Sequence, residues 1–297
     1  MNLFRYPGGK SKLQKSIIPK LSKGDKTSPR QYREPFFGGG SVGLTMLDHP
    51  HVTGVWINDK DPGIASLWTA IAQHPNQLIE CIELFSPSVN AFDAFKAELL
   101  AVTSIPTDTE ALVNLGFKKL ALHQMSFSGL GTMSGGPLGG RRQLSVGKID
   151  SRWSPRRLCQ KIGDFHERFA ALKVSGCTCL DFADVIEDET CDCLIYCDPP
   201  YVVQGNNLYQ CGFTEQDHVR LAECLSKTPH PWVLSYDDCP LVRDLYSWAQ
   251  IEELAVGYSV SNVRRTSELL ITSGTGAVVL PFMVRKKGTP TPYLLAS

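Results

Sequence analysis

The stretch from Cys191 to Tyr201, which reads CDCLIYCDPPY, constrains the fold of this chain more than any other. Its apolar part, residues 193–197, has the length and composition of a buried strand. Prolines lack the amide hydrogen that a sheet requires, so the strand has to end at Asp198. The residue before a proline favours extended backbone. Asp198 and Pro199 are therefore expected to be held rigidly at the carboxyl edge of a sheet, where open α/β sheets bind ligands.

The groups at this strand end suit a nucleobase with an exocyclic amino group. The Asp198 carboxylate and the Pro199 carbonyl would accept the two amine hydrogens, while the Tyr201 ring stacks on the base. Accepting both hydrogens withdraws the nitrogen lone pair from conjugation and makes the amine nucleophilic. The alternative is an ordinary strand end with a surface aspartate, because Asp and Pro are common turn residues. Other motifs have to decide between the two interpretations.

Composition limits the class of protein. The 297 residues suggest one large or two ordinary domains, and 42% apolar with 20% charged residues is typical of a globular protein with a full core. No apolar run is long enough for a transmembrane helix. Charge and glycine occupy the N-terminal region where a signal peptide would have its apolar segment. Ten cysteines without such a signal predict reduced thiols and a cytoplasmic location.

Two Cys-x-Cys pairs, Cys177/Cys179 and Cys191/Cys193, raise the question of a zinc site. Spacing of two in a strand places both sulfurs on one face. Zinc ligands are usually separated by two to four residues, often with histidines nearby. Buried strand cysteines are common, so we predict no metal.

Charge is segregated along the chain although its net value is zero. Residues 118–161 contain nine Lys or Arg and one acid, a net charge of +8, whereas residues 180–198 contain seven acids and no base. This pattern is expected where a cationic cofactor meets a polyanionic substrate. A solvated surface is the other explanation of the basic run.

Two glycine-rich turns precede predicted helices. The first, Tyr6 to Lys10, comes before a helix at 11–21 and presents amides and a charge. It lacks the first glycine of a phosphate-binding P-loop, because that position is Phe4. The second, Glu34 to Gly43, reads as a strand end, a turn and a helix that begins near Ser41. A turn of this kind brings the backbone close to a nucleoside.

Asp59 follows the β-branched run 52–57 about twenty residues after the second glycine turn. A βαβ nucleoside site places its ribose-binding acid at this distance. The same turn also contains Gly-x-Gly-x-x-Gly at Gly38, Gly40 and Gly43, so a dinucleotide dehydrogenase is an alternative. The dehydrogenase interpretation leaves the Asp-Pro-Pro-Tyr motif unexplained.

The remaining pattern alternates strands with helices, which predicts an α/β fold with a doubly wound, mostly parallel, Rossmann-like sheet. A glycine-rich stretch, residues 126–147, carries Arg141 and Arg142, and we expect it to close on a DNA backbone or to be a linker. The expected helices are 64–83, 92–102, 112–125, 156–172 and 217–226. The expected strands are 172–179, 193–197, 232–236, an antiparallel pair at 254–260 and 269–272, and an edge strand at 278–284, with an unstructured tail from 286.

Four motifs in this order resemble the Dam-like family of DNA adenine-N6 methyltransferases. They are Tyr6-Pro-Gly-Gly-Lys10, Glu34-Pro-Phe-Phe-Gly-Gly-Gly-Ser41, Asn58-Asp59 and Asp198-Pro-Pro-Tyr201. The likeness extends from about residue 4 to about residue 272. It implies S-adenosylmethionine as the methyl donor and a flipped-out adenine in double-stranded DNA as the acceptor.

The resemblance also implies the roles of individual residues. It implies a catalytic domain of residues 1–65 and 165–297, with a mainly helical target-recognition insert at 66–164. It also implies that the protein is a monomer and does not contact a membrane. The catalytic residues would be Asp198, Pro199 and Tyr201. The cofactor-binding residues would be Tyr6, Lys10, Phe36, Gly38, Gly40, Ser41, Asp59, Asp181 and Asp198. The DNA-binding residues would be Lys118, Lys119, Ser128, Arg141, Arg142, Arg264 and Arg265. Near the end of the chain, Ser267-Glu268-Leu269 is similar to a Ser-Glu-Leu motif of the family.

One departure from the family pattern concerns DNA specificity. Family members that read GATC carry Asn-Gly-Leu-x-Arg, whose arginine contacts a guanine; here the matching residues are Ser128 to Thr132. Threonine lacks the fork with which arginine reads guanine, so GATC is not expected unless Arg141 or Arg142 replaces it. The open alternatives are methylation of cytosine N4 or of adenine in RNA, and a DNA-binding module that has lost catalysis. A solitary or phage-borne enzyme is as compatible as one with a restriction partner.

Overall fold

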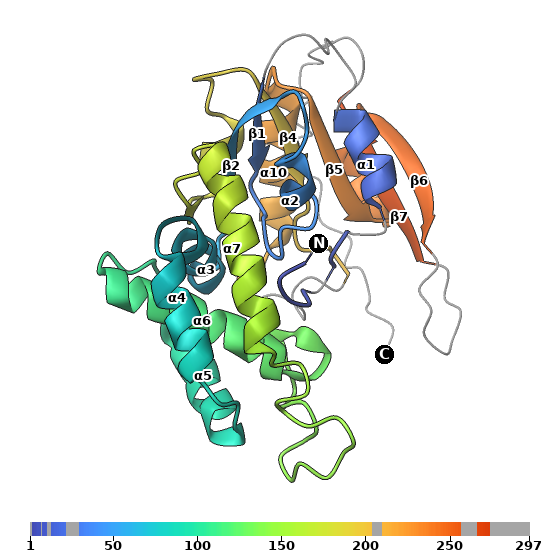
Figure 1. The fold of residues 1–297 in the computed structure, drawn as a ribbon. Helices are drawn as coiled ribbons and strands as arrows, with labels where there is room; N and C mark the ends of the chain where they lie inside the picture. Colours follow the sequence, from blue (N-terminus) through green and yellow to red (C-terminus); the bar gives the residue numbers. More distant parts are fainter. Residues whose placement is uncertain are drawn as a thin grey trace.

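A seven-stranded sheet forms the centre of the protein (Figure 1). The computed structural model describes residues 2–6, 8–10, 13–21, 30–203, 210–256 and 266–273. The strand order is β3-β2-β1-β4-β5-β7-β6, in which the first five run parallel and β7 runs antiparallel to both β5 and β6. The strands are β1 (Arg30–Glu34), β2 (Val52–Asn58), β3 (Cys177–Thr178), β4 (Cys193–Cys197), β5 (Trp232–Asp237), β6 (Gln250–Val256) and β7 (Thr266–Thr272).

Helices cover both faces of this sheet, as a doubly wound fold requires. Alternate residues of β4 point to opposite faces: Leu194 and Tyr196 pack beside α1 (Gln14–Leu21) and α2 (Gly43–Met46). Cys193, Ile195 and Cys197 pack on the other face, beside α8 (Phe182–Ile186), α10 (Glu215–Lys227) and α11 (Pro240–Leu245). Burial on both faces explains why the strand is apolar throughout. The predicted Rossmann-like α/β architecture is confirmed.

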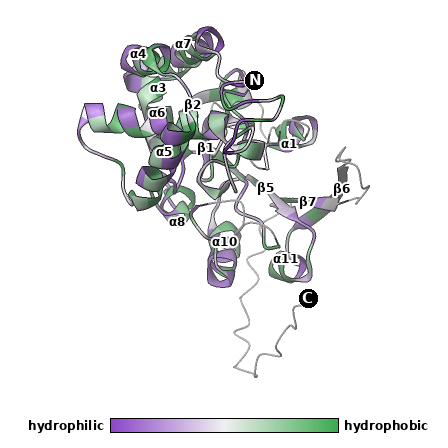
Figure 2. Cartoon of the chain, turned by 90° about the horizontal axis from the view of Figure 1, so that it is seen from below, coloured by the Kyte–Doolittle hydropathy of each residue, from purple (hydrophilic) through white to green (hydrophobic). Residues whose placement is uncertain are grey.

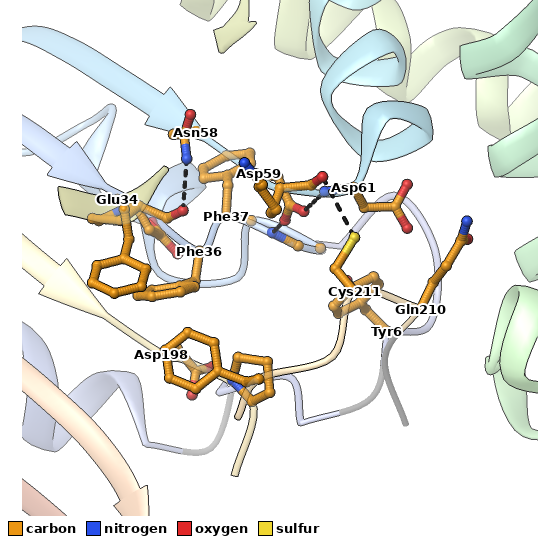
Figure 3. Close-up of a pocket in the computed structure, with 18 of the residues that line it drawn as sticks. Tyr6, Glu34, Phe36, Phe37, Asn58, Asp59, Asp61, Asp198, Gln210 and Cys211 are labelled. Carbon is orange, nitrogen blue, oxygen red and sulfur yellow. Dashed lines mark hydrogen bonds between the residues drawn. The ribbon is translucent and has the colours of Figure 1, made fainter. Parts of the chain in front are cut away.

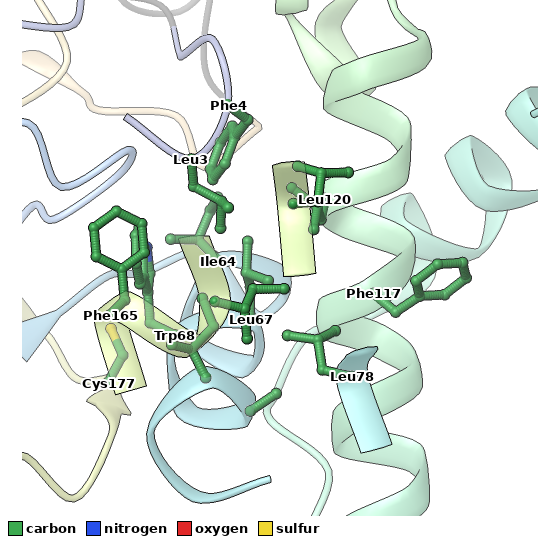
Figure 4. Packing of buried hydrophobic residues seen from close by; sticks show 14 of the residues in the cluster. Leu3, Phe4, Ile64, Leu67, Trp68, Leu78, Phe117, Leu120, Phe165 and Cys177 are labelled. Carbon is green, nitrogen blue, oxygen red and sulfur yellow. The ribbon is translucent and has the colours of Figure 1, made fainter. Parts of the chain in front are cut away.

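Five helices gather beside the β3 side of the sheet and share its core. Trp68 of α3 packs with its ring centroid 5.0 Å from that of Phe37 and 6.0 Å from that of Phe165, and Figure 4 shows Trp68 and Phe165 together with Leu120. The same cluster contains Ile57 of β2, so helices and sheet are joined by continuous apolar packing. The five are α3 (Pro62–Gln73), α4 (Pro75–Leu84), α5 (Val89–Ala101), α6 (Thr109–Met125) and α7 (Pro155–Ala171).

Helix α7 illustrates how the sequence specifies these elements. Its buried residues Leu158, Ile162, Phe165 and Phe169 recur at helical spacing. Hydrophilic residues colour the outer sides of α7 and α10 when the molecule is seen from below (Figure 2). Within the described parts of the chain, no helix combines the length and apolar character needed to cross a membrane.

Two predicted elements differ from the structure. The helix expected at 64–83 is two helices, α3 and α4, because Pro75 has no amide hydrogen to continue α3 and begins α4 instead. The strand expected at 172–179 is reduced to Cys177–Thr178. Lys173 has a φ of 54°, a turn conformation that cannot continue an extended strand.

The closing antiparallel pair is present as β6 and β7, with its first strand starting earlier than expected. The predicted edge strand at 278–284, the tail from 286 and the residues Arg264 and Arg265 lie outside the described residues. The glycine-rich stretch 126–147 is part of the packed structure: Leu138 donates its amide hydrogen to the Met125 carbonyl at 2.7 Å, and Ser126 pairs with Pro137. Its interpretation as a structureless linker was therefore wrong.

Candidate active site

A cavity of about 230 Å³ opens at the carboxyl edge of the parallel strands (Figure 3). It lies where β1 and β4 are neighbours and the chain leaves them on opposite sides of the sheet, the point at which open α/β sheets bind ligands. Four separate motifs meet there, as the sequence predicted. The predicted residues that line the cavity are Tyr6, Phe36, Gly38, Gly40, Ser41, Asp59, Asp181 and Asp198.

The second glycine turn forms one wall of the cavity. Gly38 and Gly40 have φ angles of 48° and 67°, which side-chain-bearing residues rarely adopt. A Cβ atom on Gly38 would lie 2.5 Å from the Tyr6 ring, and one on Gly40 would lie 2.7 Å from the Phe37 ring. The Trp68 indole N–H donates to the Gly38 carbonyl at 2.9 Å. The turn is thus held in place while its backbone borders the cavity.

Asp59, at the end of β2, is fixed by two backbone amides. Its carboxylate accepts hydrogen bonds from Gly38 N–H at 2.7 Å and from Asp61 N–H at 2.9 Å. Burial, followed by the nearby Asp61 charge, raises the pKa of Asp59 to about 7, although both amides act in the opposite direction. Asn58 beside it donates to the Pro35 carbonyl at 3.0 Å and accepts from Leu180 N–H at 2.8 Å, joining three strand ends.

Lys119 is not where the sequence predicted it. It was expected on a DNA-binding surface, but it is only 2% exposed and forms an ion pair with Asp61. Asp61 also caps α3 by accepting from Gly63 N–H at 2.9 Å. Burial acts to raise the pKa of Asp61, but the Lys119 ammonium outweighs it and the pKa is lowered. The sequence shows a helix start at Asp61-Pro62, but no local pattern shows that Asp61 is buried or that Lys119 is its partner.

Glu34, the last residue of β1, was not predicted as a site residue although it belongs to the glycine motif. It lines the cavity, is 2% exposed and accepts a hydrogen bond from the Tyr32 hydroxyl at 2.6 Å. Burial raises the pKa of Glu34 well above its ordinary value, with a further contribution from Asp198. The low-polarity surroundings of this carboxyl group therefore favour its neutral form more than water does.

Three phenylalanine rings form another part of the cavity wall. Phe36, Phe182 and Phe213 have ring centroids 5.6–5.7 Å apart in each pair. Phe213 was missed, because nothing in its local sequence distinguishes it from a core residue. Asp181 caps α8 through Ala183 N–H at 3.0 Å and pairs with Arg220 at 2.7 Å. An aromatic wall with a carboxylate at its edge suits a purine ring with an amino group.

Asp198 lines the cavity just after the end of β4 and belongs to a cluster of charged groups. Its Oδ1 is 2.7 Å from the Lys10 ammonium, which also donates to the Gly8 carbonyl at 2.7 Å and lies 3.4 Å from Glu268 Oε1. The Tyr201 hydroxyl donates to Glu268. Burial raises the pKa of Asp198 to about 6; Lys10 acts against this rise and Glu268 adds to it. The Asp198 side chain is 19% exposed, so the carboxylate remains accessible from the cavity.

Lys10, Pro199 and Tyr201 are not among the residues that line the cavity. Lys10 was expected to contact a cofactor, and the structure instead pairs it with Asp198. Its ammonium lies 4.7 Å from the centroid of the Tyr201 ring. The backbone amide of Lys10 donates to the Ser41 hydroxyl at 2.9 Å, so Lys10 connects the glycine turn with both Asp198 and the Tyr201 ring.

The residues predicted to bind DNA have different surroundings. Ser128, Arg141 and Arg142 are exposed, and Arg141 pairs with Asp93 at 2.8 Å. Lys118 pairs with Glu98. Thr132, for which the resemblance gave arginine in proteins that read GATC, is 4% exposed and donates to the Gln210 side chain at 3.0 Å. Thr132 therefore points into the protein.

The two Cys-x-Cys pairs do not gather with other metal ligands. Among the described residues, no group of three or more His, Cys, Asp or Glu side chains has the geometry to hold a metal ion. Cys177 and Cys193 are buried strand residues, whereas Cys191 is exposed.

Comparison with known proteins gives consistent matches over most of the chain. The family model described as D12 class N6 adenine-specific DNA methyltransferase matches residues 6–260. The retron Ec67 DNA adenine methylase of Escherichia coli is 23% identical over 92% of this chain and 91% of its own length. The DNA adenine methylase of Salmonella typhi is 23% identical over 87% of this chain and 88% of its own length.

Proposed function

Because this chain belongs to the D12 class N6 adenine-specific DNA methyltransferase family, we propose that it transfers a methyl group from S-adenosylmethionine to the N6 amine of a flipped-out adenine at a specific site in double-stranded DNA. The observation that carries this proposal is the position of Asp198. Its accessible carboxylate lines the glycine-walled cavity and pairs at 2.7 Å with the Lys10 ammonium, which itself lies 4.7 Å from the centroid of the Tyr201 ring. A methyl donor bound in the cavity and an acceptor base stacked on Tyr201 would both reach this carboxylate.

The cavity has the features that S-adenosylmethionine requires. Gly38 and Gly40, with φ angles of 48° and 67°, give the turn a conformation in which its backbone borders the cavity and can approach a nucleoside closely. Asp59 presents a carboxylate for the two ribose hydroxyls, and the three phenylalanine rings with Asp181 accommodate the adenine ring. When bound, the cofactor supplies an electrophilic methyl group on a sulfonium cation. Asp198 and the other carboxylates of this edge favour that positive charge.

The protein's own groups then prepare the acceptor amine. One Asp198 oxygen is occupied by Lys10 at 2.7 Å, which leaves the other oxygen to accept an N6 hydrogen. The Pro199 carbonyl accepts the second hydrogen, and Tyr201 stacks on the base. With the donor bound, the nitrogen lone pair would form the new N–C bond as the S–C bond breaks and the neutral thioether leaves, and the Asp198 carboxylate would accept the proton that the amine loses. Most of the rate acceleration comes from positioning and from fixed dipoles.

The helical region supplies the contact with DNA in this proposal. Residues 66–164 form the target-recognition insert, and residues 1–65 with 165–297 form the catalytic domain. Arg141 and Arg142 are exposed on the insert, where they would bind phosphates. Burial of Thr132 supports a recognition sequence other than GATC. We further propose that the protein acts as a monomer in the cytoplasm of a bacterial or phage-infected cell.

A methylation assay followed by nucleoside analysis tests the function. The protein is incubated with methyl-labelled S-adenosylmethionine and either mixed-sequence duplex DNA or RNA, and the product is digested to nucleosides. Label in N6-methyldeoxyadenosine from DNA alone is expected. Label in N4-methylcytosine or in RNA would contradict the acceptor assignment. Cofactor binding without any transfer would favour a DNA-binding module that has lost catalysis.

A further inference from the structure

We propose that Glu268 on strand β7 is a positioning residue for methyl transfer, acting on Asp198 through Lys10 and on the target base through Tyr201. This inference rests on the proposed function of the same site. Glu268 itself does not line the cavity. It acts on groups that would touch the substrate, so it is distinct from the catalytic residues.

The location of Glu268 is unusual for a charged residue. It is 5% exposed in the centre of the antiparallel part of the sheet, opposite Asp237 of β5 and Leu254 of β6. A buried carboxylate is costly unless it is paired and hydrogen-bonded. Its partners are the Tyr201 hydroxyl and the Lys10 ammonium. Both belong to the catalytic side of the cavity, which is why we assign Glu268 to that machinery.

The first effect of Glu268 is on charge. Lys10 lies between two carboxylates, 2.7 Å from Asp198 and 3.4 Å from Glu268, so three groups share a net charge of −1. With Lys10 alone, Asp198 would belong to a neutral ion pair and would be a weaker acceptor for amine hydrogens. The negative charge of Glu268 partly neutralises the Lys10 ammonium, so Asp198 remains a strong hydrogen-bond acceptor.

The second effect is on the orientation of Tyr201. Its hydroxyl is fixed by Glu268, one face of its ring is near the Lys10 ammonium, and its centroid is 6.0 Å from that of Tyr236. A ring held at three places loses little freedom when a base stacks on it. Removing the hydroxyl's acceptor would therefore misplace the base relative to the methyl donor.

Other charged and titratable groups also face Asp198 and set its protonation. They are Lys10 from the N-terminal segment, Glu268 on β7, Glu34 on β1, Tyr196 on β4 and Tyr201. Burial raises the pKa of Asp198, Lys10 lowers it, and the negative charge of Glu268 raises it further. Neutralising Glu268 should therefore shift the protonation of Asp198 to lower pH.

Single-turnover methylation between pH 5 and pH 9 tests these effects with saturating cofactor and DNA. Glu268→Gln keeps the shape and an acceptor oxygen but removes the charge. We expect its plateau rate to fall by about 10- to 100-fold and the midpoint of its acid limb to move to lower pH. Glu253→Gln, an exposed residue on the neighbouring strand, is the matched control and should behave like the wild type.

Tyr201→Phe separates the two effects and also covers the case in which Glu268→Gln fails to fold. It should lower the plateau several-fold without moving the acid midpoint, and the double variant should be slowed by less than the product of the two single effects. A Glu268→Gln plateau within twofold of wild type with an unchanged midpoint would overturn the inference. A Tyr201→Phe variant at the wild-type rate would also overturn it. Absence of methyl transfer by the wild type would instead refute the proposed function.

Discussion

The Lys119 ammonium is ion-paired with the Asp61 carboxylate inside the protein, and this contact joins helix α6 to the edge of the cavity. Lys119 belongs to α6, whereas Asp61 caps α3 and donates its amide hydrogen to Asp59. One turn further along α6, the His123 ring is 2.8 Å from the Gly129 carbonyl, in the predicted DNA-binding stretch. Helix α6 therefore contacts both Asp61 at the edge of the cavity and the glycine-rich stretch 126–147.

Lys119→Met should destabilise the protein by about 3–5 kcal/mol, the usual cost of leaving one member of a buried ion pair without its partner. Denaturant unfolding measures this loss. Lys118→Met is the control at the neighbouring position, where a partly exposed pair with Glu98 contributes about 1 kcal/mol or less. Adding Asp61→Asn should restore part of the stability of Lys119→Met. Equal effects at the two lysines would contradict a structural role for Lys119.

Asp198→Asn should slow methyl transfer by about 100- to 1,000-fold, because the neutral amide is a weaker acceptor for the amine hydrogens. DNA binding in the absence of cofactor should survive, which a DNA titration would verify. Asp192→Asn, an exposed residue just before the same strand, provides the comparison. Full activity of the Asp198 variant would refute its catalytic assignment.

Binding of S-adenosylmethionine should weaken as the pH falls below about 7. Burial raises the pKa of Asp59 to about 7 in the free protein, and only the ionised form accepts both ribose hydroxyls. Lowering the pH protonates this group, so the dissociation constant should rise by up to tenfold per pH unit. Calorimetric titration from pH 5 to pH 8 measures the slope. Asp59→Asn should bind weakly with that dependence removed, and an unchanged slope would exclude Asp59 as its source.

Gly40→Ala should destabilise the turn by about 1–2 kcal/mol, since a Cβ atom is strained at a φ of 67° and lies 2.7 Å from the Phe37 ring. We also expect weaker cofactor binding, because the turn borders the cavity. Gly54→Ala is the matched control: its Cβ atom would lie 3.9 Å from the nearest atom, on Gln31. Thermal unfolding and cofactor titration of both variants test the difference.

Arg141→Ala and Arg142→Ala should weaken DNA binding to a similar extent for all sequences, because phosphate contacts carry no sequence information. The slope of log affinity against log salt should decrease by about 1 for each arginine–phosphate interaction that the substitution removes. Binding isotherms at several salt concentrations give this slope. Arg243→Ala, whose guanidinium pairs with Asp238 and Glu253 outside the insert, should leave it unchanged. A loss confined to one DNA sequence would identify a base-reading arginine instead.

Local sequence determined most of the framework. The apolar run 193–197 followed by Asp-Pro-Pro sets where β4 ends, because proline cannot continue a strand, and Asp198 lines the cavity as predicted. The glycine turn and Asp59 were likewise predicted, since backbone conformation and strand-end position follow from short motifs. The family resemblance is confirmed over residues 6–260.

Tertiary structure decided which partner each charged side chain has. Lys119 looked like a DNA-binding residue in a basic run, but folding places it beside Asp61, which is 58 positions away in sequence. Glu268 and Lys10 come from opposite ends of the chain, and Thr132 turns inward to Gln210. Motif chemistry depends on a few adjacent residues, whereas burial and ion pairing depend on contacts between distant segments, which no local pattern contains.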